Sequence, residues 1–152
     1  MEFCSQKILR VQVQRYIPMT QQQKRVVNPK GMHGTWGLYS HAVVAGNFMF
    51  ISGQVALDEH EKVVGKEIET QTEQVMKNLQ KILEAENATF DNIVKIRVNL
   101  VNLADRPGFH KVRKKYFKDN FPASTLAMVS SLIDKELLVE VEAVAYLPQA
   151  KS

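Results

Sequence analysis

The stretches Phe-Pro-Ala-Ser-Thr-Leu-Ala-Met-Val (residues 121–129) and Leu-Leu-Val-Glu-Val-Glu-Ala-Val-Ala-Tyr (137–146) decide the fold. The second stretch alternates with a period of two, which is typical of a strand with one buried face. Its core face is predicted to hold four apolar residues, Val139, Val141, Ala143 and Ala145. Glu140 and Glu142 then share the opposite face, about 6.6 Å apart. Such a carboxylate pair suits either a catalytic site or a solvated surface, and the strand alone leaves both open.

Two helices and a further strand are predicted before this pair. Residues 66–86 place apolar side chains three and four apart, as in an amphipathic helix, and Asn87 suits the left-handed C′ position that ends it. A second helix is predicted to begin near an Asp105 cap, with Pro107 in its first turn. Between them, 92–102 is predicted to be a strand with Val94, Ile96, Val98 and Leu100 on one face and Lys95, Arg97 and Asn99 on the other.

The N-terminal half contributes short strands and one Gly-rich loop. Strands are predicted at 24–27, 40–45 and 48–52, and Gly46-Asn47 between the last two indicates a two-residue hairpin turn. The loop 28–39 does not have the spacing of a phosphate-binding loop. The order β-β-β-α-β-α-β-β predicts an α+β fold with both helices on one face of the sheet.

The composition indicates one globular domain without export or membrane insertion. At 152 residues and 45% hydrophobic content, the chain can bury a core without disulfides, and its single cysteine, Cys4, excludes an internal one. No run of about eighteen apolar residues and no signal-peptide pattern is present, so we expect a cytoplasmic protein without membrane partners. We divide the chain into a basic extension at 1–23, with an extra strand near 7–16, and a domain at 24–150.

The net charge of +4 is concentrated at the N-terminus, where the first 30 residues hold six of the 20 basic residues and one of the 16 acidic ones. The rest of the chain is near neutral. A solvated basic strand explains this better than nucleic-acid binding, which we rank last among the possible functions.

Other common catalytic and metal-binding patterns are missing. The four histidines, His33, His41, His60 and His110, lack metal-ligand spacing, so we predict no metal and no cofactor. Ser52 and Ser124 have no nucleophile-elbow glycines around them, which argues against a serine hydrolase.

Five segments together resemble the RidA (YjgF) family of reactive-intermediate deaminases. Gly37-Leu38-Tyr39-Ser40-His41-Ala42 is similar to its Gly-Pro-Tyr-Ser-x-Ala motif, 51–54 to its Ser-Gly-Gln, and 74–83 to its Gln-x3-Asn helix. Phe121-Pro122-Ala123-Ser124-Thr125 is similar to its Pro-Ala-Arg-Ser turn, and 139–145 to its Ile-Glu-Ile-Glu-Ala-Ile-Ala strand.

The resemblance implies a fold, an assembly and residue roles. The fold would be chorismate-mutase-like with a six-stranded mixed sheet, assembled as a homotrimer with a small-molecule cleft at each subunit interface. Glu140 would orient the water that releases ammonia from a 2-imino or 2-enamino acid, and Tyr39 would line the cleft. The turn residues Ser124, Thr125 and Leu126 would border the ligand, as would the backbone near Gly53.

One departure from the family pattern bears on the chemistry. Ser124 occupies the position of the arginine that holds the substrate carboxylate, and a neutral hydroxyl cannot replace a bidentate guanidinium. Arg97 is our candidate to compensate. His110 stands where the family has asparagine, and Leu38 where it has proline; His110 is kept as a binding candidate.

Three hypotheses follow from this sequence. The first is a hydrolase or deaminase for a small imine, enamine or related amide, with little activity on 2-aminoacrylate. The second is a metabolite-binding trimer without catalysis. The third is an RNA-binding or ribonuclease-like protein that uses the basic N-terminal arm.

Overall fold

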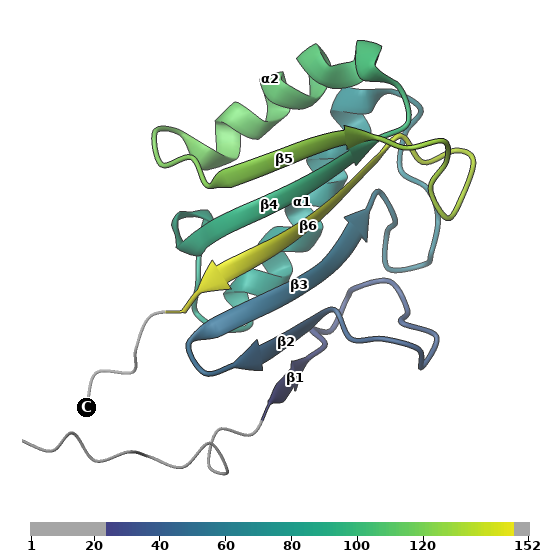
Figure 1. The fold of residues 1–152 in the computed structure, drawn as a ribbon. Helices are drawn as coiled ribbons and strands as arrows, with labels where there is room; N and C mark the ends of the chain where they lie inside the picture. Colours follow the sequence, from purple (N-terminus) through teal and green to yellow (C-terminus); the bar gives the residue numbers. More distant parts are fainter. Residues whose placement is uncertain (1–23, 148–152) are drawn as a thin grey trace, which may run out of the picture.

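The computed structural model describes residues 24–147 (Figure 1). They form a six-stranded sheet and two α-helices, in agreement with the predicted α+β class. The strands are β1 (Arg25–Val27), β2 (Ala42–Ala45), β3 (Phe48–Val55), β4 (Ile93–Leu100), β5 (Ala123–Met128) and β6 (Val139–Tyr146). The helices are α1 (Ile68–Glu84) and α2 (Arg106–Phe117), with 3-10 turns η2 (Phe90–Asn92) and η3 (Leu103–Asp105).

The sheet has the order β1-β2-β3-β6-β4-β5, so the last strand of the chain lies near its centre. Among the described strands, β4 and β5 pair in parallel. The other neighbours are antiparallel: β1 with β2, β2 with β3, β3 with β6 and β6 with β4. In Figure 1, α1 crosses behind the sheet, α2 lies along the β5 edge, and the front face carries no helix. The predicted mixed sheet, with both helices contributing to the core on one side, is confirmed.

The core forms between α1, α2 and the covered face of the sheet. The alternation in β6 places its four predicted apolar residues inside, each at most 3% exposed, and turns Glu140 and Glu142 to the uncovered face. In α1 the three-and-four spacing buries an apolar stripe made of Val75, Met76, Leu79, Ile82 and Leu83. Both periodic patterns thus indicate the buried side correctly.

Two buried amides of α1 hold the loops that flank the sheet. Asn78 donates from Nδ2 to the carbonyls of Val55 and Leu57, at 3.1 and 3.0 Å, and fixes the chain as it leaves β3. Gln71 donates from Nε2 to Glu136 O at 2.7 Å and accepts from Leu138 N at 2.8 Å. Breaking these bonds would leave buried polar groups unsatisfied, which costs free energy of folding. The two side chains therefore hold the chain against α1 just after β3 and just before β6.

The second helix begins where predicted, with Asp105 at the N-cap position and Pro107 in the first turn, but the Asp105 side chain makes no cap hydrogen bond. In the preceding turn η3, Asn102 Oδ1 accepts from Ala104 N at 3.0 Å. One prediction about β4 was wrong. Val94 is 44% exposed, because the pairing of β4 with β6 shifts register between Ile93 and Lys95 and buries Ile93 instead. The three polar residues of β4 do face away from the core.

Other boundaries were close to the predictions. Gly46 has the positive φ expected of a primed hairpin turn, at 59°. Asn87 has φ of 53°, as predicted, but it lies two residues beyond the Ala85 cap rather than at C′. The predicted strand near 7–16 lies outside the described residues. In the part of the chain that the structure describes, no helix is long and apolar enough to cross a membrane.

Candidate active site

A cavity of about 350 Å³ opens beside the loop 28–41, where β3 ends and β6 begins; we call it the Glu140 cavity. Its wall combines one carboxylate, aromatic rings, a histidine and apolar groups. The lining residues are His33, Trp36, Tyr39, Ser52, Gly53, Val55, Ile133 and Glu140. A half-enclosed space of this size with a few polar groups suits a small-molecule ligand.

The Glu140 carboxylate is held from two sides. Asn99, its cross-strand partner on β4, donates from Nδ2 to Glu140 Oε1 at 2.9 Å. On the β3 side, Glu140 packs against the bare backbone of Gly53, where an added Cβ would lie 2.7 Å from Glu140 Cδ. Gly53 falls within the register shift between Ile51 and Gln54, so the β3 bulge carries the residue that admits the carboxylate.

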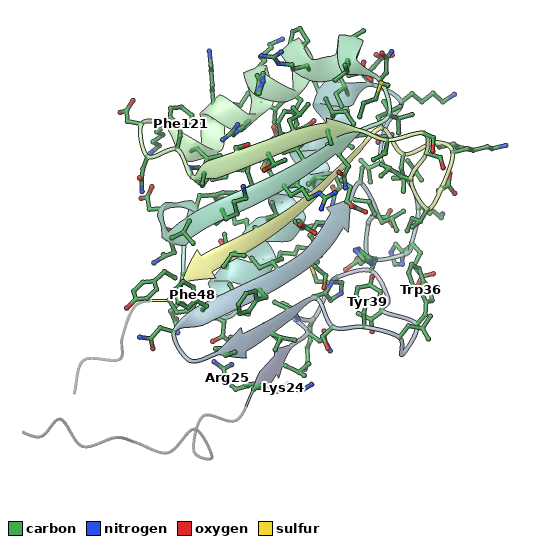
Figure 2. All side chains as sticks on the ribbon, in the orientation of Figure 1. Lys24, Arg25, Trp36, Tyr39, Phe48 and Phe121 are labelled. Carbon is green, nitrogen blue, oxygen red and sulfur yellow. The ribbon has the colours of Figure 1, made fainter. Side chains whose placement is uncertain are left out.

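The loop 28–41 brings aromatic side chains to the cavity. Figure 2 shows Trp36 and Tyr39 together on this loop, at the opposite end of the sheet from Phe48. Ser52 ties the end of the loop to β3, donating from Oγ to Ser40 O at 2.7 Å and from N to His41 O at 2.9 Å. Trp36 Nε1 donates to Glu61 Oε2 at 3.2 Å. Burial and the nearby Glu61 carboxylate raise the pKa of the Tyr39 hydroxyl, which keeps it a hydrogen-bond donor.

A pair of buried histidines lies behind the aromatic residues. His33 and His41 are 3% and 2% exposed, and their rings meet edge to face with centroids 4.8 Å apart. His41 Nε2 lies 3.0 Å from His33 O, and His33 Nδ1 lies 3.1 Å from Gly34 O. The other nitrogen of each ring, His33 Nε2 and His41 Nδ1, is buried without a hydrogen-bond partner. Burial and the neighbouring His33 lower the pKa of His41.

A second cavity, of about 200 Å³, lies on the same sheet face around the other glutamate; we call it the Glu142 cavity. Glu142 is opposite Arg97 in the β4–β6 register, and Lys95 also lines the space. Lys95 Nζ donates to Thr125 Oγ1 on β5 at 2.9 Å. The two glutamates of β6 therefore lie in different surroundings, one beside aromatic rings and the other beside basic side chains.

A known protein family matches most of the residues that form this fold. Residues 33–147 match the family model described as endoribonuclease L-PSP. The chain belongs to the RidA (YjgF) family. The resemblance read from the five sequence segments is therefore confirmed, and the six-stranded sheet with two helices is the chorismate-mutase-like fold of its structural neighbours.

Named relatives include deaminases. The chain is 35% identical over 123 residues to the human 2-iminobutanoate/2-iminopropanoate deaminase, covering 80% of this chain and 89% of the relative. It is 36% identical over 126 residues to the chloroplastic Reactive Intermediate Deaminase A of Arabidopsis thaliana, covering 82% and 67%. A solved structure from Thermotoga maritima, titled a putative endoribonuclease, superposes with a TM-score of 0.78 at 35% identity, covering 84% and 100%. Since organellar proteins are among the relatives, the cytoplasmic location stays a prediction.

The structure brings some of the predicted site residues of this RidA-family chain together in one cavity and separates others. Tyr39, Gly53 and Glu140 line the Glu140 cavity. Arg97 and Thr125 share the sheet face of Glu140 but lie at the level of Glu142, two residues along the strand pairing. Arg97 pairs with Glu142, and Thr125 pairs with Arg97.

Ser124 and Leu126 take the other face of β5, because they pair with the core residues Ile96 and Val98 of β4. Ser124 is also three residues along the strand pairing from the Glu140 level, or about 10 Å. His110 lies on α2, where its Nε2 accepts from Arg106 Nε at 3.3 Å. Within one chain, neither Ser124 nor His110 joins Glu140.

Sequence reasoning missed several residues of the site. Asn99 was assigned to the polar face of its strand, but nothing in the sequence aligned it with Glu140 across the sheet. His33 and Trp36 lie in a loop without periodicity, and Ile133 lies between two strands. Trp36 has a positive φ of 49° and is 53% exposed, and this strained, exposed position of a large ring becomes visible only in the structure.

No metal-binding group stands out near either cavity. Across residues 24–147, no three His, Cys, Asp or Glu side chains come together in a way that could hold an ion. The groups at hand in the Glu140 cavity are therefore a carboxylate, hydroxyls, an imidazole and aromatic rings. They can orient water, exchange a proton and bind a flat or cationic ligand.

Proposed function

We propose that this RidA-family chain hydrolyses small imines or enamines to a carbonyl compound and ammonia, with Glu140 positioning the attacking water. The observation that carries the proposal is the fixed carboxylate in the Glu140 cavity, bonded by Asn99 and packed against Gly53. Deaminase names among relatives at least 35% identical support the same reaction class.

The reaction needs one group that accepts and returns a proton. Water oxygen adds to the carbon of the C=N bond while the Glu140 carboxylate takes a water proton. With a protonated imine this gives a neutral carbinolamine, whose nitrogen receives that proton back from Glu140. The C–N bond then breaks and ammonia leaves, while the hydroxyl proton passes to Glu140 as the carbonyl forms and from there to the ammonia. An enamine first becomes a protonated imine by protonation at carbon. Asn99 leaves Glu140 Oε2 free for the water, because its amide donates to Oε1.

Ser124 limits the substrates in this proposal. A hydrogen bond to a charged group contributes about 1.5 to 3 kcal/mol, so loss of an arginine fork weakens carboxylate capture by roughly one to several orders of magnitude. We therefore propose little activity on 2-aminoacrylate. Arg97 lies beside Glu142 rather than at the Glu140 cavity, so it is poorly placed to compensate.

The proposal includes assembly as a homotrimer with clefts between copies. Since Ser124 and Glu140 lie on opposite faces of the sheet, only Ser124 of a neighbouring copy could approach this cavity. Sedimentation of the purified protein should give a mass of about three chains. If the protein were a monomer, Ser124 could not reach the Glu140 cavity and could not affect its substrates.

The test compares two kinds of imine formed in the assay. An amine oxidase supplies imines without a carboxylate, and an amino-acid oxidase supplies 2-imino acids; the rate of imine decay is followed for each. We expect the wild-type chain to accelerate decay of the first kind much more than the second, and Ser124→Arg to raise the rate on 2-imino acids. Wild-type acceleration on 2-imino acids equal to that of arginine-bearing relatives would refute the role given to Ser124.

Binding without catalysis is the second candidate, and the missing arginine favours it because an unanchored substrate reacts slowly. It predicts that Glu140→Gln leaves any hydrolysis unchanged. The ribonuclease-like hypothesis draws only on the description of the matching family model. It predicts salt-sensitive RNA retention that is lost when residues 1–22 are deleted.

A further inference from the structure

The carboxylates around Trp36 are not balanced by any basic side chain. A third cavity, of about 340 Å³, shares Trp36 and Ile133 with the Glu140 cavity and adds Glu61 and Asp134 to its wall. Its other lining residues are Leu57 and Leu137. Among the described residues, neither wall contains Lys or Arg. Within one chain, two adjoining cavities thus present three carboxylates and no Lys or Arg in the described walls, which favours a cation and opposes an anion.

Aromatic faces suit the same kind of ligand. The Trp36 and Tyr39 rings lie with centroids 6.1 Å apart, and both line the Glu140 cavity. The hydrogen bond from Trp36 Nε1 to Glu61 holds the exposed indole in the cavity wall. A cation over the face of a Trp or Tyr ring is attracted by the negative face of the ring, and more strongly where water is excluded.

His33 adds a buried polar atom without a partner. Gly34 O can only accept, so the 3.1 Å contact places the proton of a neutral imidazole on His33 Nδ1. Nε2 is then a lone pair, and this buried nitrogen lacks a hydrogen-bond partner. The same reasoning applies to His41. Its Nε2 carries the proton and donates to His33 O, so its Nδ1 is a lone pair. His33, the histidine that lines this wall, therefore offers an acceptor, as Glu140 does.

We propose that the Glu140 cavity selects a small nitrogen cation without a carboxylate, such as an iminium or amidinium. Glu140 and the Trp36 face hold the charge, and His33 Nε2 accepts one N–H of the ligand. The inference rests on the proposed function for the reaction, in which the protonated imine is the form that water attacks most readily. The selection of a cation is a binding property, and it can be measured without turnover.

The test uses two inert probes, benzamidine and benzoate, which share a phenyl ring and a planar head group but carry opposite charges, the first as a hydrogen-bond donor and the second as an acceptor. Their dissociation constants are measured by calorimetry on the full chain at low salt. We expect benzamidine to bind at least about tenfold more tightly than benzoate, and its affinity to fall as salt is added. Equal or tighter binding of benzoate would overturn the proposal.

Variants locate the site and separate its parts. Glu140→Gln and Trp36→Leu should each raise the dissociation constant of benzamidine about fivefold or more. The matched control is Glu142→Gln, which removes the same charge from the same face of β6 and should change it less than twofold. Losses as large in Glu142→Gln would show a general charge effect and contradict a site at Glu140.

His33 is tested by His33→Phe, which keeps an aromatic ring and removes the acceptor; we expect weaker benzamidine binding and unchanged benzoate binding. Unchanged benzamidine binding would refute the role of His33. If His33→Phe does not fold, the exposed Trp36→Leu and the Glu140→Gln results decide the inference. Benzamidine binding without any hydrolysis of imines would refute the proposed function and leave the cation site standing.

Discussion

Glu140 and Glu142 lie two residues apart on the same face of β6, yet their surroundings differ completely. Glu140 is half-buried, bonded by Asn99 and packed against Gly53, in a cavity lined by aromatic residues. Glu142 is exposed and shares a smaller cavity with basic side chains of β4. The alternation of a strand fixes the face of a carboxylate, whereas neighbouring strands and loops decide whether that carboxylate can do chemistry.

The cause of the difference lies outside β6. Near Glu140, the bulge of β3 supplies a glycine, and the loop 28–41 brings Trp36 and Tyr39. Near Glu142, the β4 partner is Arg97 and no loop residue lines the cavity. We therefore expect function at Glu140 and not at Glu142.

The largest effect should come from neutralising each glutamate in turn. Glu140→Gln removes the proton acceptor and should lower the imine hydrolysis rate by about 10²-fold or more. Glu142→Gln should change it less than twofold, because no step of the reaction uses that carboxylate. Imine decay with an amine oxidase as the source measures both. Comparable losses in the two variants would remove the functional distinction between them.

Gly53→Ala should have the next largest effect. A Cβ at this position would lie 2.7 Å from Glu140 Cδ, closer than side chains tolerate, so the carboxylate must move. A misplacement of about 1 Å can cost about 10²-fold in rate, so we expect a loss approaching that size with Tm changed little. Retained activity would show that Glu140 need not be held against β3.

Asn99→Ala tests the other support of Glu140. It removes the 2.9 Å hydrogen bond to Oε1, which is worth about 1.5 to 3 kcal/mol for a charged acceptor. We expect a loss of about tenfold in hydrolysis, rather than abolition, since Gly53 still bounds the carboxylate. The matched control is Arg97→Ala, two residues away on the same face, with little loss expected. A larger loss in Arg97→Ala would restore Arg97 as the compensating group.

The sequence could predict the parts of this site that depend on periodicity or on family motifs. The face of Glu140 follows from alternation in β6, and Tyr39 and Gly53 came from the resemblance. The pairing of Asn99 with Glu140 depends on which strands are neighbours, and β4 and β6 are separated by α2 and β5 in the chain. The positions of His33 and Trp36 depend on the path of an irregular loop, whose sequence has no periodic pattern that would predict which side chains face the cavity.

The smallest expected effect concerns the buried pair His33 and His41, which lies on the Glu140 side of the sheet face and has no counterpart at Glu142. Burial lowers the pKa of His41, so below its usual value of about 6.5 the unfolded chain binds a proton that the folded chain does not. The free energy of unfolding therefore falls as pH drops below about 6.5 and recovers as pH rises. His110, whose pKa is lowered by burial and by Arg113, Arg106 and Lys114, adds a share of the same sign.

His41→Gln should remove the His41 share alone, because the Gln amide can still donate to His33 O. Urea unfolding of both proteins at about pH 7.5 and about pH 5.5 measures the difference. We expect the variant to lose less stability than the wild-type chain on acidification, while the His110 share persists in both. Identical losses would mean that His41 takes up a proton as readily in the folded chain as in the unfolded one, and a positive charge would then lie against His33, next to the wall of the Glu140 cavity, where it repels the proposed cation.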